Sequence, residues 1–265
     1  MNELYFKCHQ CGRCCDGPPA IFLSEVLHQS HNFILELNLF INSIPNQINK
    51  NHLYQLMGQE IQICVNATDY PSIMHCIHLK DKLCSIYSER PQMCQMVPLK
   101  PYLPNSFIES SEYDKTVGLF LSEGCLSREE KPGMTKIYAS GIIHNIESNL
   151  IKQQADSDAQ FYLPMIKELG DFIEGQVKFS ATFASNQSAV VRLSICSLLL
   201  HMYNFDFMHE NALKVILSNQ IKLIEAKIDH AFQRKNKSDR ETTKILRHYL
   251  NEYQNMSLSL QSALS

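Results

Sequence analysis

The sequence predicts a mainly α-helical protein in which an irregular, cysteine-rich N-terminal part with little β structure precedes an α-helical bundle. Two observations support the irregular part. Nine of the ten cysteines lie in the first 125 residues, and five prolines interrupt residues 69–104. A segment so rich in turns and prolines needs cross-links to stay ordered. The third observation is that breakers become sparse after Gly133, where apolar residues recur at helical spacing. We therefore divide the chain into residues 1–133 and 134–265.

Composition and charge exclude several classes of protein. A hydrophobic content of 45% with 19% charged residues is typical of a globular protein, and the net charge of −3 gives no field that would attract nucleic acid. The N-terminus has no apolar stretch typical of a secretory signal. The most apolar run, residues 189–203, is too short to span a bilayer. We expect a cytoplasmic protein without nucleic-acid or membrane partners, and in a reducing compartment its cysteines favour metal ligation over disulfides.

The N-terminal part shows few regular elements. Residues 1–20 are predicted to form an irregular loop, because Gly12, Gly17, Pro18 and Pro19 disfavour regular structure. Ala20–Leu23 could form a short strand. Apolar residues at helical spacing then predict a helix from Ser24 until Pro45, and a short helix over residues 52–57. Alternation from Glu60 to Val65 predicts a strand.

The C-terminal part is predicted to contain about five helices. Tyr138, Ile142, Ile146 and Leu150 recur at four-residue spacing and predict one helix face. Further helices are predicted at 161–173, at 190–203 as a buried central helix, and along the stripe Leu213, Leu217, Ile221, Ile224 and Ile228. The last is predicted to open on a capping box of Ser238 with Glu241, and its stripe is Ile245, Tyr249 and Tyr253.

Eight cysteines form two groups with metal-ligand spacing. The predicted ligands are Cys8, Cys11, Cys14, Cys15, Cys76, Cys84, Cys94 and Cys125. In C-x2-C, two side chains of one tight turn can converge on a single ion. The eight cysteines could be distributed in three ways: over two four-ligand sites, in one shared polynuclear site, or in one site with spare cysteines. Adjacent side chains usually diverge, so the pair Cys14–Cys15 favours division between two sites or bridging of two ions. Cys64 and Cys196, inside apolar runs, are interpreted as buried free thiols.

Thiolate-rich sites suit zinc and iron–sulfur clusters alike. Asp16, His75 and His78 lie beside ligand positions and are interpreted as solvated turn residues. The basic stretch around Arg234 is interpreted as a solvated corner between two helices.

The cysteine pattern resembles a known family. Phe6-x-Cys8-x2-Cys11-Gly12-x-Cys14-Cys15, followed by Cys76-x2-Leu79-x4-Cys84-x-Ile86-Tyr87-x2-Arg90-Pro91-x2-Cys94, is similar to the YkgJ-type cysteine-cluster proteins, described as zinc- or iron-chelating domains. The resemblance covers residues 6 to about 98 and extends toward Cys125. It implies the same eight ligands. Flagellin lysine methylases are remote cousins with a related double-cysteine cluster.

No nucleotide-binding or hydrolase motif accompanies the cysteines. The prediction is a metal-binding protein of unassigned activity, with zinc placed ahead of an iron–sulfur cluster. Two alternatives are an iron–sulfur-dependent enzyme, such as a protein lysine methylase, and a zinc- or iron-handling protein. The helical part could serve as a platform for a protein partner.

Overall fold

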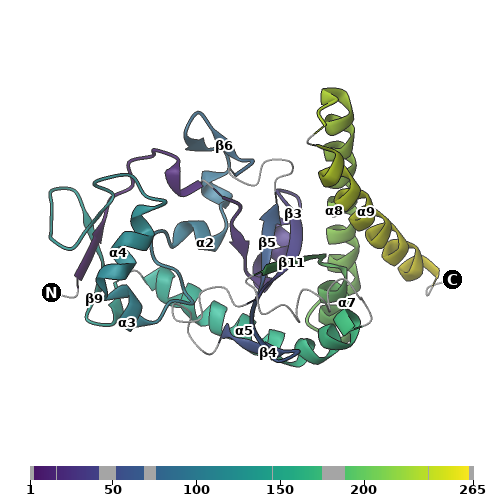
Figure 1. Ribbon diagram of the computed structural model, residues 1–265, viewed down its shortest axis with the longest axis horizontal. Helices are drawn as coiled ribbons and strands as arrows, with labels where there is room; N and C mark the ends of the chain where they lie inside the picture. The colour runs from purple at the N-terminus through teal and green to yellow at the C-terminus, as the bar shows by residue number, and fades with distance from the viewer. Residues whose placement is uncertain are drawn as a thin grey trace.

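The protein is mixed α/β, which corrects the prediction of a mainly α fold with little β structure. The computed structural model describes residues 3–15, 17–41, 52–68, 76–144, 146–174, 189–237 and 239–262 (Figure 1). Within these ranges the strands form three antiparallel sheets. Most of the helical residues lie toward the C-terminus.

The strands are β1 (Glu3–Phe6), β2 (Ala20–Ile21), β3 (Ile34–Ile41), β4 (Tyr54–Leu56), β5 (Gln59–Thr68), β6 (Leu79–Lys80), β7 (Leu83–Cys84), β8 (Leu126–Ser127), β9 (Thr135–Ala139), β10 (Ile142–Ile143) and β11 (Ala189–Ser194). One sheet has the order β10-β9-β1-β8. The central sheet has the order β11-β3-β5-β2, with β4 also paired to β5, and β6 pairs with β7.

The helix predicted from Ser24 to Pro45 is wrong over its described length beyond Gln29. Only the short turns η2 (Leu23–Glu25) and α1 (Val26–Gln29) precede strand β3. β3 lies between β11 and β5, and its side chains are buried on both faces. Apolar residues on both faces hide the two-residue period of a strand, so the spacing resembles that of a helix. The strand predicted at Glu60–Val65 is confirmed within β5. The short strand predicted at Ala20–Leu23 is confirmed only for Ala20–Ile21, which form β2, because Leu23 begins the turn η2.

Two further helical predictions are wrong because tight turns join strands there. Residues 54–61 form a β4–β5 hairpin through Met57 and Gly58, which have φ values of +50° and +76°. The face assigned to Tyr138 and Ile142 belongs to the β9–β10 hairpin, and helix α5 begins only at Ile146. A glycine as the second residue of each turn was the signal for these hairpins.

The helices are α1, α2 (Gln92–Gln95), α3 (Asn105–Ile108), α4 (Ser111–Gly118), α5 (Ile146–Glu174), α7 (Cys196–Asn204), α8 (Glu210–Arg234) and α9 (Asp239–Ser262). The helix predicted at 161–173 is the second half of α5, which continues through Pro164. The predicted central helix at 190–203 is wrong in its first half, because residues 189–194 form β11 and pair with β3.

The last two helices confirm their predicted buried stripes almost throughout. Along α8, Leu213, Leu217, Ile224 and Ile228 are buried and Ile221 is partly buried. Along α9, Tyr249 and Tyr253 are buried, whereas Ile245 is exposed and its neighbour Leu246 is buried instead. Ser238 of the expected capping box lies outside the described residues.

These helices do not form a bundle apart from the N-terminal part. α7, α8 and α9 share one hydrophobic core with the central sheet (Figure 1). Gln220 links helix α8 to the central sheet and the segment before it. Its side-chain oxygen accepts the Leu35 N–H at 2.8 Å, and its amide nitrogen donates to the carbonyl oxygens of Ser30 and Phe33 at 2.8 and 2.9 Å. The division after Gly133 stays a prediction, and strands from both sides of it pair.

A second hydrophobic core lies among β1, β9, α3, α4 and the beginning of α5. Helix α5 contributes to both cores, with Ile151 and Ala155 in this one and Phe161, Tyr162 and Met165 in the first. Residues of both cores line one cavity. The fold therefore places a hollow where its two cores meet.

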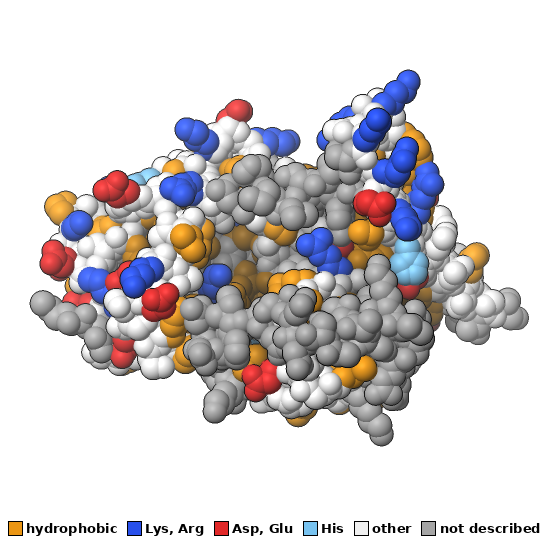
Figure 2. Space-filling model, in the orientation of Figure 1, with side chains coloured by type: hydrophobic (Ala, Val, Ile, Leu, Met, Phe, Trp, Pro, Cys, Tyr) orange, Lys and Arg blue, Asp and Glu red, His pale blue; other side chains and the backbone are white. Residues whose placement is uncertain are grey.

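Helices α8 and α9 meet at the corner predicted for the basic stretch. Arg234 donates to Asp239 at 2.9 Å across the turn, and Lys and Arg side chains gather there in Figure 2. No helix in the described part of the chain is long and apolar enough to cross a membrane.

Candidate metal centre

All eight predicted ligands line the same cavity, whose volume is about 880 Å³. They come from the N-terminal loop with its turn η1 (Arg13–Cys15), from the segment around the β6–β7 hairpin, from helix α2, and from Cys125 after α4. Cys64 of β5 also lines the cavity. Every one of the ten thiols is free of disulfide bonds.

Backbone hydrogen bonds bring these distant segments together. Strand β1 pairs with β8, and the Lys7 N–H donates to the Cys125 carbonyl oxygen at 2.9 Å. The Cys76 N–H donates to the carbonyl oxygen of Cys15, also at 2.9 Å. Because each pair joins residues far apart in sequence, the cysteine groups meet through the tertiary fold.

Gly12 allows the N-terminal loop to approach the β6–β7 hairpin. Its φ of +77° is a conformation that L side chains rarely adopt. A Cβ atom at this position would lie 3.0 Å from Leu79 Cδ1 and 3.2 Å from both Cα and the carbonyl oxygen of Lys82. The hairpin turns through Asp81 and Lys82, both at positive φ. The backbone of this turn is the part of the hairpin that approaches Gly12.

His78 is held away from ligation by its own hydrogen bonds. Its Nε2 lies 3.0 Å from the Asn32 carbonyl oxygen, and its Nδ1 lies 3.4 Å from the Ser85 hydroxyl. This engagement agrees with its interpretation as a structural turn residue. His75 and Asp16 lie outside the described residues.

Helix α2, which carries Cys94, is fixed by a buried carboxylate. Glu25 Oε1 accepts the Gln92 N–H at 2.9 Å, at the first turn of α2. Gln29 donates to the Glu89 carbonyl oxygen at 2.9 Å. The turn between Cys84 and Cys94 therefore rests on residues from another part of the chain.

Arg90 stacks on an aromatic ring beside the thiols. Its guanidinium carbon lies 4.1 Å from the centroid of the Tyr87 ring, and in the described structure it forms no ion pair with Glu89 or Asp81. The Cys15 thiol raises the pKa of Cys14 and burial raises that of Cys94, and the positive charge of Arg90 partly offsets both shifts. Arg90 therefore lies where it can compensate part of the charge of bound thiolates.

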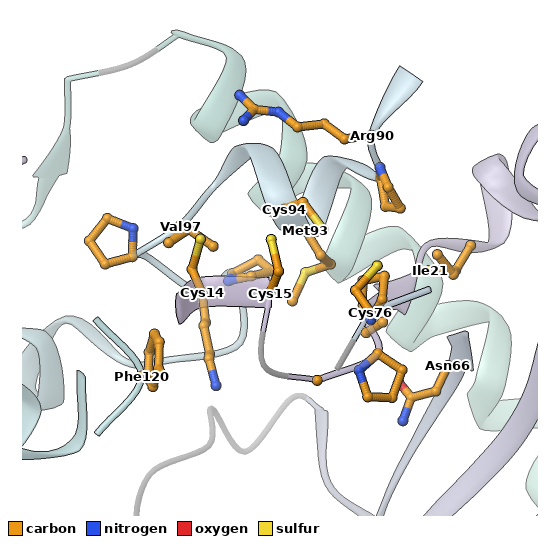
Figure 3. A pocket seen from close by; sticks show the side chains of 18 of the residues that line it. Cys14, Cys15, Ile21, Asn66, Cys76, Arg90, Met93, Cys94, Val97 and Phe120 are labelled. Atoms are coloured by element: carbon orange, nitrogen blue, oxygen red, sulfur yellow. The ribbon is translucent and has the colours of Figure 1, made fainter. Parts of the chain in front are cut away.

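The adjacent thiols of Cys14 and Cys15 hydrogen-bond each other, so the expectation that they diverge is wrong here. Figure 3 shows both side chains on the same side of their loop, facing helix α2. This shared bond raises the pKa of Cys14 and lowers the pKa of Cys15. Cys15 is therefore the more readily ionised thiol of the pair.

The remaining thiols fall into two neighbourhoods. Cys15 interacts electrostatically with Cys94, Cys76 and Cys84, and burial raises the pKa of Cys94 to about 12. On the other side, Cys11 accepts a hydrogen bond from the Ser122 hydroxyl at 2.9 Å, which lowers its pKa.

Cys125 is buried next to Cys11 in the second neighbourhood, and its burial raises its pKa. Cys8 is exposed at the mouth of the cavity.

The donor set fits a thiophilic metal, although the thiols are not arranged around a common point. In the described part of the chain, no three Cys, His, Asp or Glu side chains converge closely enough to hold an ion. Cys11 accepts a hydrogen bond from the Ser122 hydroxyl, and Cys14 and Cys15 interact with each other. Ligation requires thiolates, so binding would release protons and reorient these side chains.

Two supporting residues had no signal in the sequence. Ser122 and Glu25 lie far from the cysteines they assist, in segments without any motif. Gly12 was interpreted only as a breaker, whereas the structure requires it for close approach of two segments.

Residues 7–125 match the CxxCxxCC family model, described as "putative zinc- or iron-chelating domain". No curated protein and no solved structure matches the chain. The matched range ends at Cys125 and therefore contains all eight predicted ligands. The match confirms, over residues 7–125, the resemblance to the YkgJ-type cysteine-cluster proteins.

Proposed function

We propose that the chain is a metal-binding module whose cysteine cluster holds zinc, with an iron–sulfur cluster as the alternative cofactor. The observation that supports the proposal is that eight thiols, from four segments of the chain, line one cavity. A bound ion would cross-link these segments. Since the ligands meet only in the folded chain, metal binding would contribute folding free energy to the N-terminal part.

Two four-thiol sets account for all eight cysteines. The neighbourhood of Cys15 supplies the set Cys15, Cys76, Cys84 and Cys94. The neighbourhood of Cys11 supplies Cys11, Cys14 and Cys125. Cys8, the remaining thiol that lines the cavity, completes this second set. Four thiolates in a closed set are typical of structural zinc. This arrangement divides the adjacent pair between two sites, one of the options left open by the sequence.

Metal and acid-labile sulfide content, measured on protein purified without oxygen, tests the metal. We expect zinc without sulfide and a colourless solution. Iron with equimolar sulfide and absorbance in the visible range would replace zinc with an iron–sulfur cluster. Protein that contains neither metal, and takes up neither on reconstitution, would contradict the proposal.

Serine substitutions test the ligand sets. Cys11→Ser and Cys84→Ser each remove one thiol from a different set, so each should lower the metal content and the melting temperature of the loaded protein. Cys196→Ser is the matched control, because Cys196 begins helix α7 and does not line the cavity. Full metal content and unchanged melting in both variants would refute the ligand assignment.

A further inference from the structure

The cavity extends beyond the thiols into a chamber lined by apolar and aromatic side chains. Its walls come from both cores and include Phe22, Tyr54, Phe107 and Tyr162. Small-molecule sites commonly enclose about 300–1,000 Å³ and combine apolar walls with a few polar groups. The whole cavity, including the part beside the thiols, has a volume of about 880 Å³, which lies in this range.

Two polar side chains enter this chamber from one loop. Leu99 and Leu103 are buried in the second core, and the Tyr113 hydroxyl donates to the Pro98 carbonyl oxygen at 3.1 Å. These contacts fix the loop, and Lys100 and Tyr102 line the cavity between the two buried leucines.

The two side chains lie near each other and among aromatic rings. The Lys100 ammonium lies 5.9 Å from the centroid of the Tyr102 ring and 5.1 Å from that of Phe120. An ammonium group beside aromatic faces gains some cation–π attraction, but burial removes its water.

Both donors lack a protein acceptor within the described residues. Lys100 forms no ion pair there, and the Tyr102 hydroxyl forms no hydrogen bond. Both side chains are half-buried, and a donor that no protein group accepts stays available to a ligand in the cavity. Two neighbouring unsatisfied donors in one cavity are therefore suited to a shared acceptor from a ligand.

The remaining charges of the wall favour an anion. Lys100, Arg13, Lys82 and Arg90 supply cations, whereas Asp158 is the sole carboxylate among the described lining residues. The Asp158 carboxylate already accepts the Leu23 N–H at 2.7 Å and the Gln154 amide at 3.0 Å. Its oxygens are thus engaged away from Lys100.

We propose that this chamber binds a small organic anion with an apolar body, whose carboxylate or phosphate accepts hydrogen bonds from Lys100 Nζ and Tyr102 Oη. The apolar body would lie against the aromatic walls. The site uses side chains other than the thiols, so it does not depend on the identity of the metal.

Calorimetric titration of the full chain with octanoate, octyl phosphate, 1-octanol and octyltrimethylammonium tests this proposal. We expect octanoate or octyl phosphate to bind at one site, and the alcohol and the cation to bind at least tenfold more weakly. The stronger of the two anions identifies the preferred head group.

Lys100→Met should weaken the binding of the anion by about tenfold or more, since a charge-assisted hydrogen bond is lost. Tyr102→Phe should weaken it less. Lys80→Met is the control, because Lys80 is exposed on β6 and does not line the cavity.

Metal content, measured on the same samples, separates this proposal from the metal proposal, and Lys100→Met should retain the metal content of the wild type. If Lys100→Met fails to fold, reductive ¹³C-methylation of the wild type replaces it, and octanoate should protect Lys100 from modification. Equal binding of octanol and octanoate, no anion binding to the wild type, or no protection of Lys100 would each overturn the proposal.

Discussion

Replacement of Gly12 by alanine tests how the cysteine loop docks on the β6–β7 hairpin. A left-handed conformation costs an L residue about 1–2 kcal/mol. The added Cβ would also lie 3.2 Å from the backbone of Lys82, which cannot turn aside as a flexible side chain would. Overpacking of this kind costs about 1–3 kcal/mol. Together these effects predict that Gly12→Ala lowers the free energy of unfolding by about 2–5 kcal/mol.

Two other glycines separate the contributions in a urea denaturation series. Gly58→Ala introduces the same left-handed strain, at φ +76°, with nothing within 4 Å of the new Cβ. It should cost only the conformational part, about 1–2 kcal/mol. Gly17→Ala has neither a positive φ nor a close contact, so it should be nearly neutral. The docking argument fails if Gly12→Ala and Gly58→Ala destabilise the protein equally.

The same series should separate the variants by metal affinity. Gly12 lies in the loop that carries Cys11, and its contact is with the hairpin that ends at Cys84. Gly12→Ala should therefore weaken metal binding in a chelator competition, whereas Gly58→Ala should not. An unchanged affinity for Gly12→Ala would show that ligand geometry does not depend on this contact.

Two further predictions concern buried polar residues. Gln220→Leu should lower the free energy of unfolding by on the order of 3 kcal/mol, because it leaves one N–H and two carbonyl groups unpaired in the core. Gln233→Leu on the exposed face of α8 is its control, and equal effects in urea denaturation would refute the role of the hydrogen bonds. Burial raises the pKa of Asp158 from 3.8 to about 6, so the folded state binds more protons than the unfolded chain, and stability falls as pH rises through that interval. Between pH 5 and pH 7.5 the wild type should lose about 1–2 kcal/mol relative to Asp158→Asn, and a constant difference would contradict this.

Most residues of the candidate site could be predicted from the cysteine pattern. Eight thiols at ligand spacing were enough to identify the cavity wall and the family, because ligand spacing within a turn is a local property of the chain. The residues that position the thiols were not predictable. Glu25 and Ser122 reach Gln92 and Cys11 across 67 and 111 positions of sequence, and no local pattern records such contacts.

The fold prediction failed where burial on two faces removed periodicity. Strand β3 has Leu35, Leu37 and Leu39 on one face, but Ile34, Glu36 and Asn38 on the other are buried too. Their cover comes from α8, α9 and neighbouring strands, which lie far away in sequence. By contrast, the stripe of α8 is buried on one side only, and it was predicted correctly.

The set of thiols, the likeness to a chelating family and the long C-terminal helices could be predicted from the chain, because each depends on residues close together in sequence. The antiparallel sheets, the shared core and the chamber next to the thiols depend on contacts between distant segments, so only the folded structure revealed them. A sheet needs partners from distant segments, such as β11 beside β3. The cavity lies where two separately packed cores meet. Neither the pairing of the strands nor the meeting of the cores can be predicted from the spacing of residues close together in sequence.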